Sequence, residues 1–303
     1  MSDAARREAI RGTWIAAATF VLWGVMPLYW HLLKAVPSLQ IVLHRIAWSA
    51  LFVGAFLLWR DGHGWLRAAL AQPRLRAMLA LSGLLIAFNW GLYIWAVNAG
   101  HVVESALGYF INPLLNVLIG VLFLRERLRP LQWLSVAIAA VGVLWLTFRF
   151  GRLPWIALAL AASFALYGLI RKLLAVDSIT GLGVESAYLL LPAVALLAWS
   201  EAPASGGFPA GYGAAASSLL VLSGIVTALP LVGFAYAVRR IPLASVGLMQ
   251  YIAPTLQFLI GVLVLREDFD QARLFGFVLI WIALAVFAGE GLLRARRGRP
   301  ATA

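Results

Sequence analysis

The amino-acid sequence predicts an all-α polytopic membrane protein with ten transmembrane helices, arranged as two inverted five-helix repeats. Three observations lead to this fold class: an apolar composition, a series of apolar stretches of membrane length, and an internal repeat. Of the 303 residues, 63% are hydrophobic and 12% are charged, whereas about 25% of a typical soluble protein is charged. Because so few charges cannot cover the surface of a soluble fold of this size, we expect the chain to lie in a bilayer.

The apolar residues fall into ten stretches, separated by short charged or Pro- and Gly-containing segments. Each stretch is close to the about 20 residues that cross roughly 30 Å of hydrocarbon. Basic residues precede the first stretch, as in a signal peptide, but its length and the lack of a small-residue cleavage site predict that it is retained. We predict spans at 13–33, 40–59, 77–98, 103–124, 131–148, 153–173, 181–199, 217–238, 243–265 and 272–293.

The positive charges favour one orientation in the membrane. If the N-terminus is cytoplasmic, 18 of the 24 Lys and Arg residues lie in cytoplasmic segments and 5 in external loops, with Arg45 inside a span. Such an excess is typical of cytoplasmic loops. We therefore predict cytoplasmic tails at 1–12 and 294–303, a cytoplasmic loop at 60–76 and an external loop at 200–216. The net charge of +12 is interpreted in the same way, and not as a nucleic-acid site.

The second half of the chain repeats the first. Shifted by 141 residues, segment 107–126 falls on segment 248–267 with twelve of 20 positions identical. The repeats are predicted at 13–149 and 153–293. Because five spans are an odd number, the second repeat begins on the opposite side of the membrane. This inverted topology is typical of secondary transporters.

The second span carries a charged residue, Arg45, next to His44. The 141-residue shift places His44 opposite Glu185 in the seventh span, so both repeats contribute ionisable groups at a similar depth. A charge at the centre of a membrane helix costs about 2.5–3.5 kcal/mol on insertion scales. Arg45 could therefore line a substrate site, form a structural ion pair or snorkel to the interface. His44 and Glu185 are candidates for proton coupling, and we expect Arg45 and Glu185 to face the same cavity.

Four further acidic residues lie near the ends of predicted spans. We expect Glu104 and Glu290 at the membrane interface, where water solvates their charges. Glu126 and Glu267 each follow an Arg at the end of a matched span, and we expect them in ion pairs or helix-end contacts. None of the four is a predicted site residue.

Polar residues recur on one face of the fourth span. At 100° per residue they fall within an arc of about 60°, and two glutamines occupy matched positions of the ninth span. Such residues either join helices by hydrogen bonds or line a cavity, and their recurrence on matched helices favours a cavity. The predicted lining residues are Arg45, Asn89, Tyr93, Tyr109, Asn112, Asn116, Tyr188, Gln250, Tyr251 and Gln257.

Each of these two spans also contains a proline, Pro113 in the fourth and Pro254 in the ninth. A proline lacks an amide donor and frees the carbonyl four residues earlier. Interruptions at corresponding positions of two repeats point to a transport site. We therefore predict helix breaks at Pro113 and Pro254, with the site between the repeats near the bilayer midplane.

Motifs of several other protein classes are missing from the sequence. There is no cysteine, which excludes disulfides and thiol chemistry, and there is no phosphate-binding loop for ATP. The four histidines lack metal-ligand spacing, so we expect no metal, no cofactor and no catalytic residue. Two other classes stay open. A membrane-embedded enzyme would use His44 with Glu185, and a non-transporting scaffold or sensor would need neither matched prolines nor an intramembrane charge.

The chain resembles the RarD group of EamA-type permeases, in the drug/metabolite transporter superfamily. The resemblance extends from about residue 12 to residue 293 and implies a ten-helix permease of the bacterial inner membrane that exports a metabolite or drug. One departure is Arg125-Glu126, where the family has Gly-Glu, which weakens the expectation of a tight turn at position 125. The segments that carry the resemblance are LHRIAWS (43–49), NWGLYIWAVNAGHVVESALGYFINPLLN (89–116), SFALYGLIRK (163–172) and MQYIAPTL (249–256).

Together these features predict a secondary transporter that works by alternating access. Amides, phenols and deep indoles around about one net charge suit a small amphipathic or aromatic solute of low net charge. The expected partners are this solute, the lipid bilayer and protons as a candidate coupling ion. The sequence indicates no particular oligomeric state.

Overall fold

The computed structural model describes residues 3–98, 101–151, 153–201, 207–209, 211–264 and 271–297, and the regular secondary structure of these segments is helical. Arg152, Arg266 and Glu267, which the sequence assigns to loops or span ends, lie outside the described residues. The helices are α1 (Asp3–Leu32), α2 (Ser38–Asp61), α3 (Gly64–Ala71), α4 (Pro73–Asn98), α5 (Val102–Leu122), α6 (Pro130–Phe150), α7 (Trp155–Leu173), α8 (Ser178–Glu201), α9 (Gly213–Val238), α10 (Leu243–Gln250), α11 (Ile252–Leu259), the π-helical turn η1 (Ile260–Val264) and α12 (Gln271–Arg297).

Within the described segments, seven helices are long and apolar enough to cross a membrane: α1, α2, α4, α6, α7, α8 and α9. Shorter apolar helical segments cover Leu107–Leu122 in α5 and Leu274–Glu290 in α12. Large apolar side chains such as Leu84, Phe148 and Leu191 are exposed on the outside, as contact with lipid requires. The chain is therefore a polytopic membrane protein with a helical fold.

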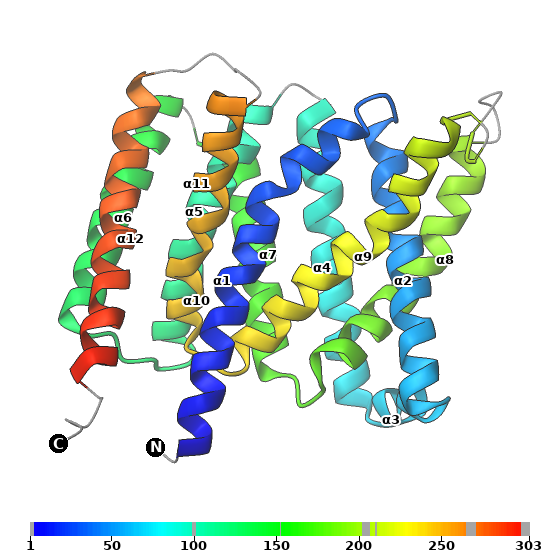
Figure 1. Cartoon of the computed structure of the whole chain (residues 1–303), viewed down its shortest axis with the longest axis horizontal. Coiled ribbons are helices and arrows are strands. Elements are labelled where there is room, and N and C mark those ends of the chain that lie inside the picture. The colour runs from blue at the N-terminus through cyan, green and yellow to red at the C-terminus, as the bar shows by residue number, and fades with distance from the viewer. Residues whose placement is uncertain are drawn as a thin grey trace.

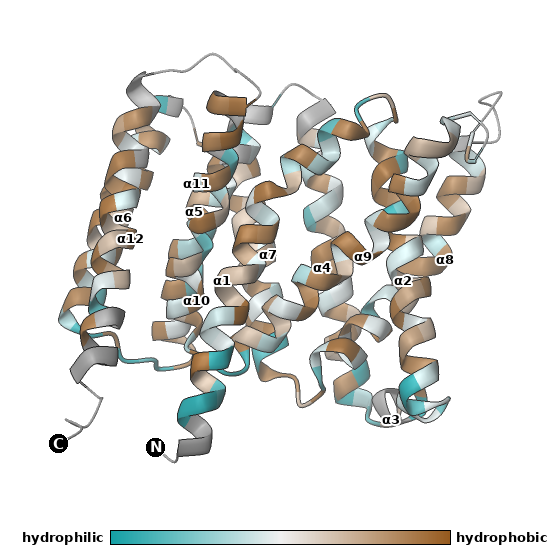
Figure 2. Cartoon of the chain, viewed as in Figure 1, coloured by the Kyte–Doolittle hydropathy of each residue, from teal (hydrophilic) through white to brown (hydrophobic). Residues whose placement is uncertain are grey.

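Figure 1 shows the helices side by side in a broad slab, with α6 and α12 packed together at one end and α2, α8 and α9 at the other. The start of α1, the end of α12 and helix α3 lie at one edge, here called the terminal edge. The α1–α2 connection lies at the opposite edge. In Figure 2 apolar residues cover the middle of the helices, and hydrophilic residues gather at the terminal edge where α1 begins.

The two prolines of the matched spans differ in their effect on the helices. Helix α5 runs through Pro113 without a break, so the break predicted there is wrong. One missing amide bond is tolerated in a membrane helix when neighbouring helices pack around it, and α5 packs closely against α7 and α10. In the second half the chain leaves the helix at Tyr251, between α10 and α11. Pro254 stands in the first turn of α11, where an amide donor is not needed.

The end of α5 turns tightly in spite of its arginine. Arg125 has φ 54°, a left-handed conformation that glycine adopts at little cost and that other residues pay about 1–2 kcal/mol to adopt. The departure from Gly-Glu therefore changes the residue and keeps the turn, contrary to the expectation from the sequence. The turn brings Glu126 to the first residues of α10. Its carboxylate accepts hydrogen bonds from the amides of Leu243 (2.8 Å) and Ala244 (2.9 Å) and pairs with Lys172 Nζ (2.8 Å).

The acidic residues expected at the membrane interface are buried instead. Glu104 is 1% exposed, and its carboxylate accepts a hydrogen bond of 2.8 Å from the amide of Ile156. The amides in the first turn of a helix lack partners within the helix, and Glu104 supplies one where α7 begins against α5. Glu290 is 8% exposed and pairs with Arg129, with 3.4 Å between Nη1 and Oε1. Both residues join helices, which explains their burial.

Candidate functional site

A cavity of about 390 Å³ lies between the two halves of the chain. Its walls come from α1, α2, α4 and α5 of the first half and from α7, α9, α10 and α11 of the second. Sites for small molecules typically have about 300–1,000 Å³, so the volume suits one small solute. The predicted lining residues found in its wall are Arg45, Asn89, Tyr93, Tyr109, Asn112, Gln250 and Gln257.

Arg45 is held in the cavity wall by groups from three other helices. Its Nε donates a hydrogen bond of 2.9 Å to Thr227 Oγ1 on α9. The guanidinium carbon lies 4.6 Å from the ring centroid of Trp30 on α1 and 5.0 Å from that of Trp90 on α4. Both distances are within the range of cation–π attraction. Among the described residues no carboxylate pairs with Arg45, so the structural ion pair considered for it does not form there.

The amides around the cavity differ in what they bind. Asn89 Nδ2 donates to the carbonyl of Leu160 (2.8 Å) and to Ser163 Oγ (2.9 Å). Gln257 Nε2 donates to the carbonyl of Trp23 (3.1 Å). These two amides join helices through bonds of the kind common in membrane proteins. Asn112 is different, because its Oδ1 is buried and has no hydrogen-bond partner among the described residues.

Aromatic side chains close the cavity toward the terminal edge. Phe20, Trp23 and Phe164 line it, and Trp23 and Phe164 lie 5.8 Å apart between ring centroids. Behind them Phe234 packs against Phe164 at 5.2 Å and stacks on Tyr167 at 6.0 Å. Phe234 and Tyr167 are almost completely buried. We call these five residues the aromatic floor.

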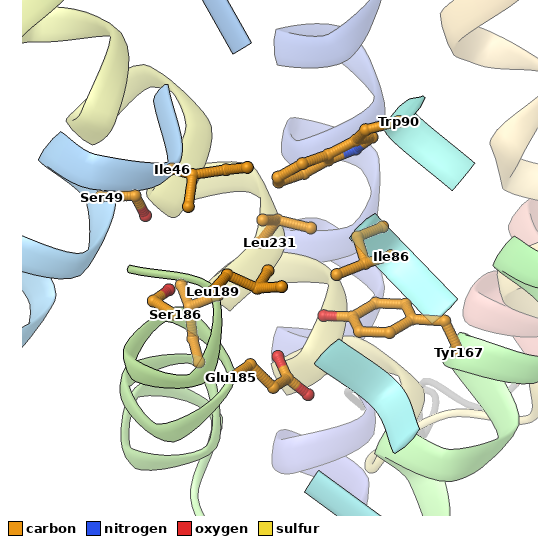
Figure 3. Close-up of a pocket in the computed structure, with 10 residues that line it drawn as sticks. Ile46, Ser49, Ile86, Trp90, Tyr167, Glu185, Ser186, Leu189 and Leu231 are labelled. Carbon is orange, nitrogen blue, oxygen red and sulfur yellow. The ribbon is translucent and has the colours of Figure 1, made fainter. Parts of the chain in front are cut away.

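Glu185 lies at a second, much smaller cavity of about 20 Å³, which has room for about one water molecule. Its Oε1 pairs with Arg171 Nη1 at 3.2 Å and accepts a hydrogen bond from Ser82. In Figure 3 the hydroxyl of Tyr167 points toward the Glu185 carboxylate, and Trp90 lies at the far end of the same cavity. Arg45 and Glu185 therefore do not face one cavity, and that prediction is wrong.

The comparison with known proteins decides the family. The family model of the EamA-like transporter family matches residues 10–148. Protein RarD of Streptomyces exfoliatus is 45% identical over 97% of this chain and 93% of its own length. The chain belongs to the RarD group of EamA-like transporters. An uncharacterized transporter of Pseudomonas aeruginosa is also 45% identical, over 95% of this chain and 96% of that protein.

The fold of this RarD-group protein recurs in a solved structure. A crystal structure of a protein that is 22% identical aligns with a TM-score of 0.70, over 92% of this chain and 98% of that chain. At this level of identity the likeness concerns the fold alone. The family itself is one of membrane transporters, and the RarD-group chain is accordingly a multi-pass membrane transporter.

Several residues predicted for the site of this RarD-group transporter do not line the large cavity. Asn116 is buried behind it and donates to Gln250, and Tyr251 donates to the carbonyl of Phe110 (3.1 Å). Tyr188 is 40% exposed on α8, because one side of that helix faces outward. His44 is buried against Phe208. Pro254 lines the cavity, although it was predicted only as a helix break.

Sequence reasoning missed three residues that shape these sites. Arg171 lies beside Lys172 among the charges that the sequence assigns to a cytoplasmic segment, yet it is 1% exposed and is the partner of Glu185. Trp30 lies near the end of a predicted span, where tryptophan is common at the membrane interface, and Thr227 is one of several small polar residues in its span. The contact between Thr227 and Arg45 joins two distant helices, and such a contact produces no periodic pattern in the sequence. Thr227 could therefore not be found from the spacing of polar residues.

Proposed function

We propose that this RarD-group protein is a secondary transporter that exports a small amphipathic solute across the bacterial inner membrane by alternating access. Ten helices in two inverted five-helix repeats would surround the solute, with both termini in the cytoplasm. The observation that carries the proposal is the 390 Å³ cavity, because both halves of the chain contribute to its wall. Solute sites at the interface of repeats are typical of such transporters.

The position of the cavity supports a conformation that is open on one side only. Trp30 near the end of α1, Ser38 at the start of α2 and Ser105 near the start of α5 line it, and these helix ends lie away from the terminal edge. Tyr93 and Tyr109, 5.9 Å apart between centroids, are 37% and 41% exposed. The aromatic floor closes the other side. With cytoplasmic termini, this conformation faces outward, and release of the floor gives access from inside.

Transport by the purified chain tests this function. A solute that raises the melting temperature of the protein binds the folded state, and vesicles that contain only this chain should carry it across the bilayer. Asn112→Ala should lower the apparent affinity by about tenfold, the loss of one buried hydrogen bond to the solute. Leu118→Ala, an exposed position on the same helix, should transport normally. Folded protein that moves no stabilising solute would contradict the proposal and favour a scaffold or sensor.

Cysteine labelling tests the orientation, since the chain has no cysteine of its own. Ala35 in the α1–α2 connection and Ala71 at the end of α3 are both exposed. Ala35→Cys should react with a membrane-impermeant maleimide in intact cells, and Ala71→Cys should react only after the cells are opened. The reverse pattern would contradict cytoplasmic termini, and equal labelling of both variants would contradict their placement on opposite sides.

Proton coupling through Glu185 is part of the proposal. The groups that face its carboxylate are Arg171 and Tyr167 of α7 and Ser82 of α4. Protonation would neutralise Glu185 and release Arg171 from its pair, which would loosen the contact between α7 and α8. We favour Glu185 over His44, the other candidate, because Glu185 lines the small cavity and pairs with Arg171 of a neighbouring helix.

A further inference from the structure

The described residues that line the large cavity include a positive charge and no negative one. Among the described residues that line it, Arg45 is the only residue of the Asp, Glu, Lys, Arg and His types. The buried acids of the neighbouring helices are engaged elsewhere: Glu104 accepts from the amide of Ile156, and Glu185 pairs with Arg171. A cation in a membrane protein that has no anion beside it is unfavourable. The described lining therefore offers Arg45 no negative partner. A bound molecule with a negative charge can provide one.

The guanidinium is oriented so that it can bind an anion. Thr227 Oγ1 accepts a hydrogen bond from Arg45 Nε, and the rings of Trp30 and Trp90 contact the guanidinium group. Among the described residues, neither Nη group has a hydrogen-bond acceptor or an ion-pair partner. The planar fork of an Arg matches a carboxylate with two parallel hydrogen bonds. Because the side chain is already fixed on three sides, little conformational freedom is lost when an anion binds.

The rest of the cavity indicates what the anion carries. The aromatic floor presents Trp23 and Phe164, which are partly exposed and whose faces suit another ring. Asn112 also lines the cavity, and its amide can form a hydrogen bond with a polar group of the ligand. An amino-acid ammonium group would need a carboxylate, which the described lining does not contain. Organic cations would be repelled by Arg45.

We propose that the cavity binds a small aromatic monocarboxylate, with its carboxylate on Arg45, its ring on the aromatic floor and a polar group such as a hydroxyl at the Asn112 amide. This inference rests on the proposed transport function, to which it adds the charge class of the solute. It requires one negative charge on the ligand. A neutral ligand of the same shape would leave the guanidinium without a partner.

A matched pair of probes tests the charge directly. para-Hydroxyphenylacetate and its neutral amide, para-hydroxyphenylacetamide, share a ring and a hydroxyl donor and differ in charge. Calorimetric titration of the purified full-length protein should show the acid binding at least about tenfold more tightly than the amide, as expected for one charge-assisted pair. Arg45→Gln should bind the two probes equally, and Arg45→Lys should keep part of the preference. Arg7→Gln, an exposed position on α1, should bind as the wild type does.

The outcomes separate this inference from the proposed function. Equal binding of acid and amide by the wild type, a preference that survives in Arg45→Gln, or no binding of either probe would each overturn the inference. If the same protein still transports another solute in vesicles, the transport function stands without it. If the acid binds with the expected preference but is not carried across the bilayer, the inference stands and the proposed function fails.

Discussion

Replacing Arg171 with Gln is expected to lower the free energy of unfolding by about 3–5 kcal/mol, the cost of leaving one charge of a buried pair without its partner. The side chains of Arg171 and Glu185 are 1% and 2% exposed, and 3.2 Å separates Nη1 from Oε1. Arg171 Nη2 also donates to the carbonyl of Ser178 (2.9 Å). Gly181 faces the same guanidinium, which occupies the space that a Cβ would take. The local packing is therefore built around this charge pair.

The double variant separates the pair from its surroundings. Glu185→Gln alone should also destabilise the protein, whereas Arg171→Gln combined with Glu185→Gln should recover most of the loss, because no uncompensated charge remains. Denaturant unfolding in detergent measures the free energy of unfolding of the two single variants and of the double variant. If the losses of the single variants simply add, the pair contributes no coupling energy.

The double variant also tests proton coupling: its transport rate should not change with pH if Glu185 carries the proton, and a preserved pH dependence would place coupling elsewhere.

Replacing Glu126 with Ala is expected to cost at least about 1.5–3 kcal/mol, the contribution of one hydrogen bond to a charged group. One carboxylate serves the amides of Leu243 and Ala244 and the ammonium of Lys172, and its side chain is 12% exposed. The variant leaves two amides of α10 without an acceptor. Hydrogen exchange should therefore accelerate at the start of α10, in addition to the loss of stability.

A surface ion pair provides the control for Glu126. Glu8 pairs with Arg240 at 2.6 Å, but its side chain is 48% exposed, and exposed pairs contribute little to stability. Glu8→Ala should therefore change stability little. Comparable losses for Glu8→Ala and Glu126→Ala would contradict the role of Glu126 in joining α5, α7 and α10.

The helices could be predicted from the sequence because lipid imposes an apolar stretch of nearly fixed length. The polar stripe of α5 was informative for the same reason: helical geometry places Tyr109 and Asn112 on one face, and both line the cavity. The predictions that failed concerned residues whose environment depends on contacts between helices. From the sequence, Glu104 near a helix end is expected at the interface, but in the structure it binds the start of α7. Arg171 next to Lys172 is expected in a loop, but in the structure it pairs with Glu185.

Pro113 shows a different limit. The loss of one amide donor is certain from the sequence, but its consequence depends on how neighbouring helices support the chain. The carbonyl of Pro113 lies where Gly247 has no side chain, 2.6 Å from the position of a Cβ. Such a close approach holds α5 against α10, and it follows from the pairing of two distant segments. The sequence of either segment alone does not contain this information.

Trp90 and Leu231 line both cavities, one beside Arg45 and the other beside Glu185. The two compartments thus share a partition made of one indole and one leucine side chain. A solute that pushes the indole aside enlarges its own compartment at the expense of the neighbouring one, which has room for only about one water molecule. A displacement of this one indole would therefore change the shape of both compartments at once.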